Sequence, residues 1–423
     1  MQSGFRFKPI YGFIAIAAVI FMGAVYLFLL NPRIQEYQTA RYYETHPPQE
    51  QVFTPVGVDA EPGVPQLDVQ VKATPVPTRP DVVVHEEDGA ELPDAVLLEG
   101  VTYTHQHGKW NYCAPANLTM ALSYWGVNQK RDDVAHWLKP FDDDKNVNPD
   151  EMVAYVEAQT PLHALSRVGG TLDVVKRLVA NGYPVLIEKG EIIVDVSTGI
   201  PEWAGHYAIV VGYDDTRRVL VTHDSYYSPP DYPLNFEISY REVEEGWAHF
   251  NNTFIVVYPP YEELTVYRLL SGYADPLWAV QTAYQQTREG LLNLSGVDLY
   301  FSAYHFGTNQ MLLGDYRSAA FAYDEAFRIY AQLETDTRPW RTMWYLPGAY
   351  EAYFNVGRYQ DVINLATHTI ESTPKPYFEE SWYWRGIAYA ALGDVEAARS
   401  DLEQALKYNE NYQAAQTALS ALD

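Results

Sequence analysis

The spacing of hydrophobic residues changes several times along the chain, and each change predicts a different kind of element. The first run, residues 10–30, is apolar and carries no charge, and about 20 apolar residues suffice to cross a bilayer as a helix. Arg6 and Lys8 precede the run, and basic residues favour the cytoplasmic side. We therefore expect residues 1–31 to form a cytoplasmic tip and a single membrane-spanning helix, with the folded domains outside the cytoplasm.

A cleaved signal peptide is the alternative interpretation of this run. The apolar region of a signal peptide is usually shorter, roughly 7–15 residues, and is followed by a small-x-small cleavage site. Here the run ends in "LFLLNPR", which contains no such site. An uncleaved anchor is therefore favoured, although Arg33 and Arg41 reduce the charge difference that sets the orientation.

Residues 32–96 show no regular hydrophobic period, and the part from about residue 47 to 93 is rich in proline and acidic residues. Repeated proline is incompatible with long helices and with central strands. We expect a semi-extended linker that holds the next domain away from the membrane.

Residues 97–260 read as one domain in which helical spacing comes first and strand-like runs follow. The first helix is predicted to begin close to Cys113, with Pro115 in its first turn, where a missing N–H is tolerated. Three helices and three strands are predicted, near residues 113–126, 149–160, 171–182, 183–190, 206–215 and 219–225. A helical turn and a last strand precede Pro259. This order indicates an α+β domain rather than a doubly wound sheet.

A bridging segment, residues 261–298, is predicted to contain a helix around 278–292, and paired helices follow in residues 299–423. In that last region Gly314, Gly357 and Gly393 each close one helix, and a second helix begins at once.

The region 299–423 resembles tetratricopeptide repeats, in which small residues stand where the paired helices touch. The resemblance is carried by Trp382, Gly386, Tyr389, Gly393, Ala398 and Ala405. About three repeats are expected, which is near the minimum for a stable stack. The middle repeat has Tyr350 in place of its first small residue. An ordinary helical bundle is the alternative.

The charge and the motifs exclude several classes of function. The net charge of −26 argues against nucleic acid as a partner, because phosphate contacts need clustered Lys and Arg. No Gly-rich phosphate loop or dinucleotide fingerprint occurs, so no cofactor is expected. A zinc site from His105, His107 and His223 is an alternative, but the H-E-x-x-H spacing is absent and we expect no metal.

Cys113 is the only cysteine among 423 residues, and it stands where a helix is predicted to begin. A cysteine attacks a carbonyl only as the thiolate, and a helix N-terminus helps to lower its pKa from about 8.5. A histidine completes the activation, a carboxylate orients it, and hydrogen-bond donors stabilise the oxyanion. The candidates are His206 at the start of a strand, Asp224 after the next strand, and Gln106 seven residues before the cysteine.

Each of these residues also has a purely structural interpretation. Cys113 is then an inert buried thiol, and His206 is a hydrogen-bonded structural histidine. Asp224 is then a turn residue, because Asp-Ser favours turns by itself. The order of the residues along the chain favours the catalytic interpretation.

The stretches "QHGKWNYCAPANLTMAL", "NGYPVLIEKG", "GHYAIVVGYDD" and "THDSYYSPP" occur in this order. The order resembles papain-like cysteine peptidases related to the bacteriocin-processing, double-glycine peptidases, and it covers most of residues 97–260. The resemblance implies a papain-like fold with Cys113 as nucleophile and His206 as general acid and base. It also implies that Asp224 orients the histidine and that Gln106 donates to the oxyanion.

The sequence departs from the family pattern at two positions. Ala114 replaces the usual glycine after the nucleophile, and Tyr226 stands near where the family usually has proline after its aspartate. The second departure makes Asp224 the least secure of the assignments.

These observations predict a membrane-anchored cysteine peptidase that hydrolyses peptide bonds through a Cys-His-Asp triad. The repeats are expected to bind a peptide or a partner protein. Two alternatives stay open. One is a non-catalytic, peptide-binding scaffold with a peptidase-like domain, and the other is amide hydrolysis on a non-protein substrate by the same residues.

Overall fold

The structure is a computed structural model that describes residues 31–57, 92–109, 111–194, 201–226 and 234–423. The predicted membrane-spanning helix at residues 10–30 lies outside these ranges. Within them, every helix is too short or too polar to cross a bilayer.

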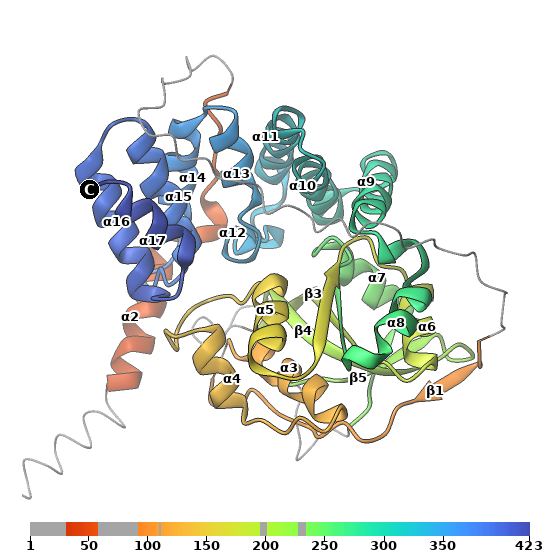
Figure 1. The fold of residues 1–423 in the computed structure, drawn as a ribbon. Coiled ribbons are helices and arrows are strands. Elements are labelled where there is room, and N and C mark those ends of the chain that lie inside the picture. The colour runs from red at the N-terminus through yellow and green to blue at the C-terminus, as the bar shows by residue number, and fades with distance from the viewer. Residues whose placement is uncertain (1–30, 58–91, 110, 195–200, 227–233) are drawn as a thin grey trace, which may run out of the picture.

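One antiparallel sheet organises the first half of the described chain (Figure 1). Its strands are β1 (Ala95–Leu97), β2 (His163–Arg167), β3 (Val185–Val194), β4 (Pro201–Asp214), β5 (Val219–His223), β6 (Phe236–Ser239) and β7 (Phe254–Tyr258). Their order is β2-β7-β3-β4-β5-β6, and the short β1 pairs with the far end of β4. The predicted α+β character of this domain is confirmed.

Helices cover both faces of the sheet, because side chains alternate between the faces along each strand. Leu186, Tyr207 and Ile209 join the hydrophobic core on one face, whereas Val185 and Ile187 join the core on the other. The first face is covered by α3 (Cys113–Tyr124), α4 (Arg131–Leu138) and α5 (Pro149–Gln159), and the second by α6 (Leu172–Ala180), α7 (Tyr240–Ala248) and α8 (Glu263–Leu270). Thr171 caps α6, because its side chain accepts a hydrogen bond from the Val174 N–H.

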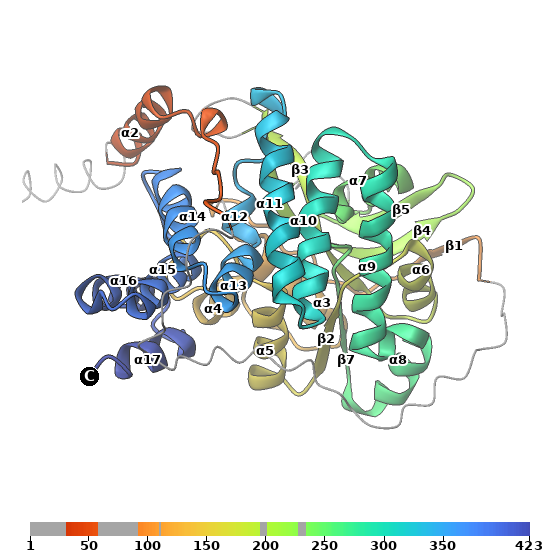
Figure 2. The same cartoon turned by 90° about the horizontal axis from the view of Figure 1, so that it is seen from above.

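The second half of the chain is helical and lies beside the sheet domain (Figure 2). Its helices are α9 (Pro276–Asn293), α10 (Gly296–Leu312), α11 (Tyr316–Gln332), α12 (Thr342–Tyr345), α13 (Gly348–Asn355), α14 (Tyr359–Glu371), α15 (Glu379–Ala391), α16 (Val395–Tyr408) and α17 (Gln413–Ser420). The predicted turn glycines Gly314, Gly357 and Gly393 have φ of +83°, +79° and +84°. Residues with a Cβ rarely adopt this left-handed conformation, so glycine ends the first helix of each pair.

Tyr350 shows how the middle helix pair accommodates a large residue at a position where the repeat usually has a small one. The side chain is fully buried. Its hydroxyl donates to Thr369 Oγ1 at 2.8 Å and lies 3.0 Å from Ser381 Oγ. A polar partner on each neighbouring helix therefore satisfies the buried phenol.

The sheet domain and the helical region share a hydrophobic core. Trp203 of β4 and Phe250 are buried in the same cluster as residues of α10. The ring centroids of Trp203 and Phe301 are 4.9 Å apart. The segment between α11 and α13, which contains α12, reaches back to β4.

The structure describes the first part of the predicted linker, residues 32–57. Residues 31–45 form α2 (Asn31–Thr45), and the chain after it packs on the repeat helices. Phe53 is buried with its ring centroid 4.9 Å from that of Phe327, and the Val56 N–H donates to Asp361. An extended, proline-containing strand can dock through one aromatic anchor, which periodicity does not reveal.

Candidate active site

Cys113 is the first residue of α3, and its side chain is partly exposed. Asn117, one turn further along the helix, donates through Nδ2 to the carbonyl oxygens of Cys113 at 2.9 Å and Tyr207 at 2.8 Å. These bonds fix the start of α3 against β4. The thiol therefore stands at a helix N-terminus, as predicted.

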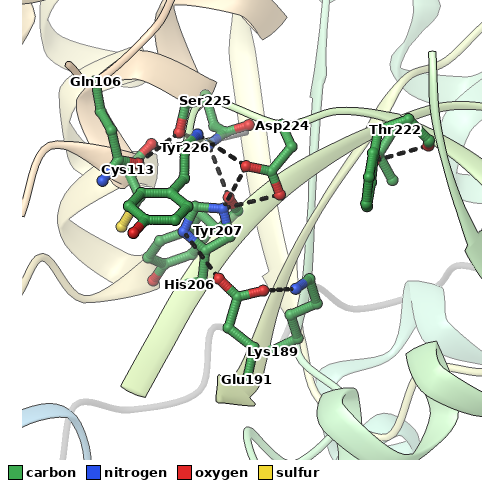
Figure 3. A network of polar contacts seen from close by, with 12 residues as sticks. Gln106, Cys113, Lys189, Glu191, His206, Tyr207, Thr222, Asp224, Ser225 and Tyr226 are labelled. Carbon is green, nitrogen blue, oxygen red and sulfur yellow. Dashed lines mark hydrogen bonds and ion pairs between the residues drawn. The ribbon is translucent and has the colours of Figure 1, made fainter. Parts of the chain in front are cut away.

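His206 lies within β4, which begins at Pro201, five residues before the predicted start of this strand. Asp224 follows β5, the antiparallel neighbour of β4. The strand pairing brings both to the same corner, where His206 Nε2 is 2.9 Å from Asp224 Oδ1 and 3.0 Å from Oδ2 (Figure 3). The Cys113 side chain lies beside the His206 ring, close enough for hydrogen bonding and charge from the imidazole to act on the thiol. Because Nε2 faces Asp224, Nδ1 is the nitrogen left for the thiol.

The surroundings of these three groups favour a charged pair. Burial alone would raise the pKa of Cys113, but the hydrogen bond and positive charge of His206 bring it below its ordinary value. Burial would likewise lower the pKa of His206, yet Asp224 and Glu191 raise it well above its usual range. Burial opposes ionisation of Asp224 as well, but His206 holds its pKa at about 2. The corner therefore stabilises a thiolate beside an imidazolium.

Gln106 lies in the loop before α3 and is 4% exposed. Its Oε1 accepts a hydrogen bond from Ser225 Oγ at 2.8 Å, and its backbone N–H donates to the Ser225 carbonyl at 3.0 Å. Because Oε1 is held by Ser225, the amide nitrogen is left on the side of Cys113 (Figure 3). An oxyanion donor needs this orientation.

Ser225 and Asn117 belong to this arrangement, although neither was predicted from the sequence. The Ser225 hydroxyl is fully buried and lies 3.1 Å from Asn117 Nδ2, so it links the asparagine to Gln106. Asn117 is a polar residue on an otherwise apolar buried helix face, which is a usable signal. No pattern in the sequence singles out Ser225.

The two departures from the family pattern fit into the structure. Ala114 is 2% exposed and packs into the core beneath α3. The Tyr226 N–H donates to Asp224 Oδ1 at 2.8 Å. Proline has no N–H and could not make this bond, so tyrosine at this position helps to hold the carboxylate.

The three histidines of the alternative zinc site lie in the loop before α3 and at the end of β5. His107 Nε2 lies 3.0 Å from the Tyr226 carbonyl, and His223 is buried beside the Tyr103 ring. Within the ranges that the structure describes, no three His, Cys, Asp or Glu residues are grouped so that they could hold a metal ion.

A cavity of about 60 Å³ adjoins the thiol. Pockets that bind small molecules are usually about 300–1,000 Å³. The cavity is lined by Cys113, His206 and Gln106, by Glu188 and Glu191 of β3, and by Lys145, Arg341, Trp344 and Tyr345. A cavity of this volume has room for only a few water molecules.

The helical region forms one wall of this cavity through α12. Arg341 is 3% exposed, forms an ion pair with Glu202 and donates to the Trp203 carbonyl at 3.2 Å. A Cβ added at Gly205 would come within 3.1 Å of the Tyr345 ring and 2.6 Å of Phe250. Glycine before the histidine therefore lets the helical region approach the site closely, which the sequence did not predict.

Comparison with known proteins identifies two parts of the chain. The model of the Peptidase C39-like family matches residues 98–253, and the tetratricopeptide repeat model matches residues 379–412. Among solved structures, a chain described as a C39-like peptidase from Bacillus anthracis is similar, with 15% identity and a TM-score of 0.31. The match covers 38% of the present chain and 96% of that chain. No curated protein matches the sequence.

Proposed function

Because the chain contains a C39-like peptidase domain followed by tetratricopeptide repeats, we propose that it is a cysteine peptidase. In this proposal Cys113, His206 and Asp224 are the catalytic triad. The observation that carries it is the placement of the thiol beside an imidazole that the Asp224 carboxylate holds, at the edge of a cavity. A buried structural cysteine needs neither partner.

The reaction follows from this geometry. The Cys113 thiolate attacks the carbonyl carbon of the substrate, and the Cys113 N–H and the Gln106 amide stabilise the oxyanion. His206 gives its proton to the leaving amine, which departs and leaves an acyl-enzyme. Neutral His206 then takes a proton from water, the hydroxide attacks the thioester, and the acid product leaves as the thiolate forms again.

The helical region has two roles in the proposal. Its repeats bind the substrate protein or a partner, and α12 controls access to the thiol. A peptide needs more room than about 60 Å³, so Tyr345 and Trp344 have to move away from β4 before a substrate binds. We further propose that residues 10–30 anchor the protein in a membrane, with the peptidase outside the cytoplasm.

A second candidate function is a peptide-binding scaffold without catalysis, because the small cavity leaves no room for a peptide at the thiol in this conformation. Mass spectrometry of a peptide library incubated with the full chain separates the two. The peptidase generates new peptide termini, and Cys113→Ala and His206→Ala each reduce their rate of appearance by at least about 10³-fold. Equal cleavage by the wild type and Cys113→Ala removes Cys113 from the mechanism. Peptide retention without cleavage by either protein supports the scaffold.

A further inference from the structure

The catalytic histidine has a second carboxylate neighbour on strand β3. Lys189 is the cross-strand partner of His206, and Glu191 is the partner of Ala204. Residues two apart on a strand share a face, so Lys189 and Glu191 lie on the His206 side of the hairpin. Glu191 Oε1 is 4.0 Å from His206 Nδ1, and its other oxygen is paired with the Lys189 ammonium (Figure 3).

This neighbour is unusual because one of its oxygens has no hydrogen-bond donor. Glu191 Oε1 is buried, and within the described part of the chain it has no such partner. The side chain of Glu191 is 12% exposed, and it lines the cavity that adjoins Cys113. A desolvated carboxylate oxygen without a donor costs stability, and here it faces the nitrogen that handles the proton.

Charged groups face His206 from each element packed around it. Asp224 follows β5 and holds Nε2, while the Cys113 thiol on α3 lies beside the ring. Lys189 and Glu191 come from β3, and the Tyr226 ring centroid is 6.4 Å from that of the imidazole. When the thiolate and the imidazolium are formed, the anions beside the ring are Asp224, Glu191 and the thiolate, and Lys189 is paired with Glu191. Lys145 and Arg341 line the same cavity. Lys189 offsets only part of that negative charge.

We propose that Glu191 is a positioning residue that acts through His206: it faces Nδ1 and keeps the proton on the imidazole while Cys113 is a thiolate. The thiolate–imidazolium pair then persists to higher pH than Asp224 alone would allow. The effect on turnover rests on the proposed function, whereas the protonation of His206 is a property of the resting protein.

Glu191→Gln tests this proposal, since it removes the charge and keeps the shape. Two readouts need no substrate: NMR titration of the His206 ring, and the pH dependence of iodoacetamide alkylation of Cys113. We expect the alkaline transition of both to move to lower pH, because the imidazolium loses a stabilising anion. With a cleavable peptide, kcat/KM on the alkaline side should fall about three- to tenfold.

Lys189→Gln is the matched control, because it breaks the same ion pair from its other end. Loss of this cation leaves Glu191 and Asp224 unopposed, so the alkaline transition should stay or move to higher pH. If the pair is merely structural, both variants move the transition in the same direction by the same amount, and the proposal is overturned. An unchanged transition in Glu191→Gln overturns it as well.

One further variant and one further comparison separate a failure of this proposal from a failure of the proposed function. Glu191→Asp retains the charge at a greater distance and should give a transition between those of the wild type and Glu191→Gln, even if the glutamine variant folds poorly. If no peptide is cleaved by the wild type, the proposed peptidase function fails, but the titration and alkylation still decide the role of Glu191.

Discussion

The repeat region and the catalytic corner both bury charged side chains, but they treat them differently. In the repeat region two arginines each bind carboxylates through several hydrogen bonds. Arg358 binds Asp324 at 2.8 and 2.9 Å and Asp361 at 2.7 Å, and Arg385 binds Asp401 at 2.6 and 2.9 Å. In the corner, Glu191 keeps an oxygen without a donor.

The charged groups of the repeat region hold helices together, whereas those of the corner are available for chemistry. A buried ion pair with all its hydrogen bonds fixes the relative position of two elements, and removing one partner leaves the other uncompensated. A reactive group instead needs a donor or acceptor that is not already used, so that it can bind a substrate or exchange a proton. An oxygen without a donor also occurs at the buried Glu379 of α15, so the corner is distinguished by what Glu191 faces, the His206 imidazole 4.0 Å away.

The largest expected effect comes from removing an oxyanion donor in the corner. Gln106→Ala should lower kcat by about 10²–10³-fold, because the amide would stabilise charge that develops only in the transition state. KM should change little, and steady-state kinetics with one peptide substrate measure both. If kcat/KM falls by the same factor because KM rises while kcat is unchanged, Gln106 binds the substrate rather than the oxyanion.

Ser225→Ala is the matched variant for Gln106. It removes the hydroxyl that donates to Gln106 Oε1 at 2.8 Å but leaves the amide itself in place. We expect a smaller loss in kcat, about tenfold, because Gln106 becomes less well oriented. A loss as large as that of Gln106→Ala would mean that Ser225 has a role beyond holding the glutamine.

The next largest effect is expected on stability, when a buried ion pair of the repeat region is broken. Arg358→Met should lower the free energy of unfolding by about 3–5 kcal/mol, because Asp324 and the 1% exposed Asp361 lose their shared partner. Urea denaturation followed by circular dichroism measures the change. Arg328→Met, which breaks the exposed pair with Glu325, should change it by less than about 1 kcal/mol. Similar values for both variants would contradict the comparison.

The smallest effect is expected where the two regions meet. Tyr345→Ala removes the ring that packs against Gly205 and widens the cavity, so kcat/KM for a peptide should rise about two- to fivefold. Tyr345→Phe keeps the ring and should leave the rate unchanged. A fall in kcat/KM for the alanine variant would show that Tyr345 contacts the substrate instead of limiting access.

Much of the sheet domain and of the corner follows from the sequence. The helix starting at Cys113 and the hairpin of β4 and β5 have clear periodicity, and pairing across that hairpin brings His206 to Asp224. The turn glycines of the repeats are also predictable, because a residue in the left-handed conformation ends the first helix of each pair. The local sequence pattern therefore predicts an element where the element's hydrophobic period matches the face that it buries.

The remainder depends on contacts between distant segments. Strand β2 has the sequence "HALSR", which shows little alternation, and it forms because it pairs with β7. The approach of α12 to Gly205 and the docking of Phe53 depend on how the two regions fit together. Glu191 is one of many glutamates in the sequence, and only its distance from His206 distinguishes it.

The most direct test of the central claim is the pH titration of the thiolate absorbance near 240 nm, measured as the difference between the wild type and Cys113→Ser. If His206 and Asp224 stabilise the ion pair, the absorbance appears well below pH 8.5, near which an ordinary thiol ionises. It then shifts back to higher pH in His206→Ala. A transition near pH 8.5 in both proteins would show that Cys113 is an unactivated thiol.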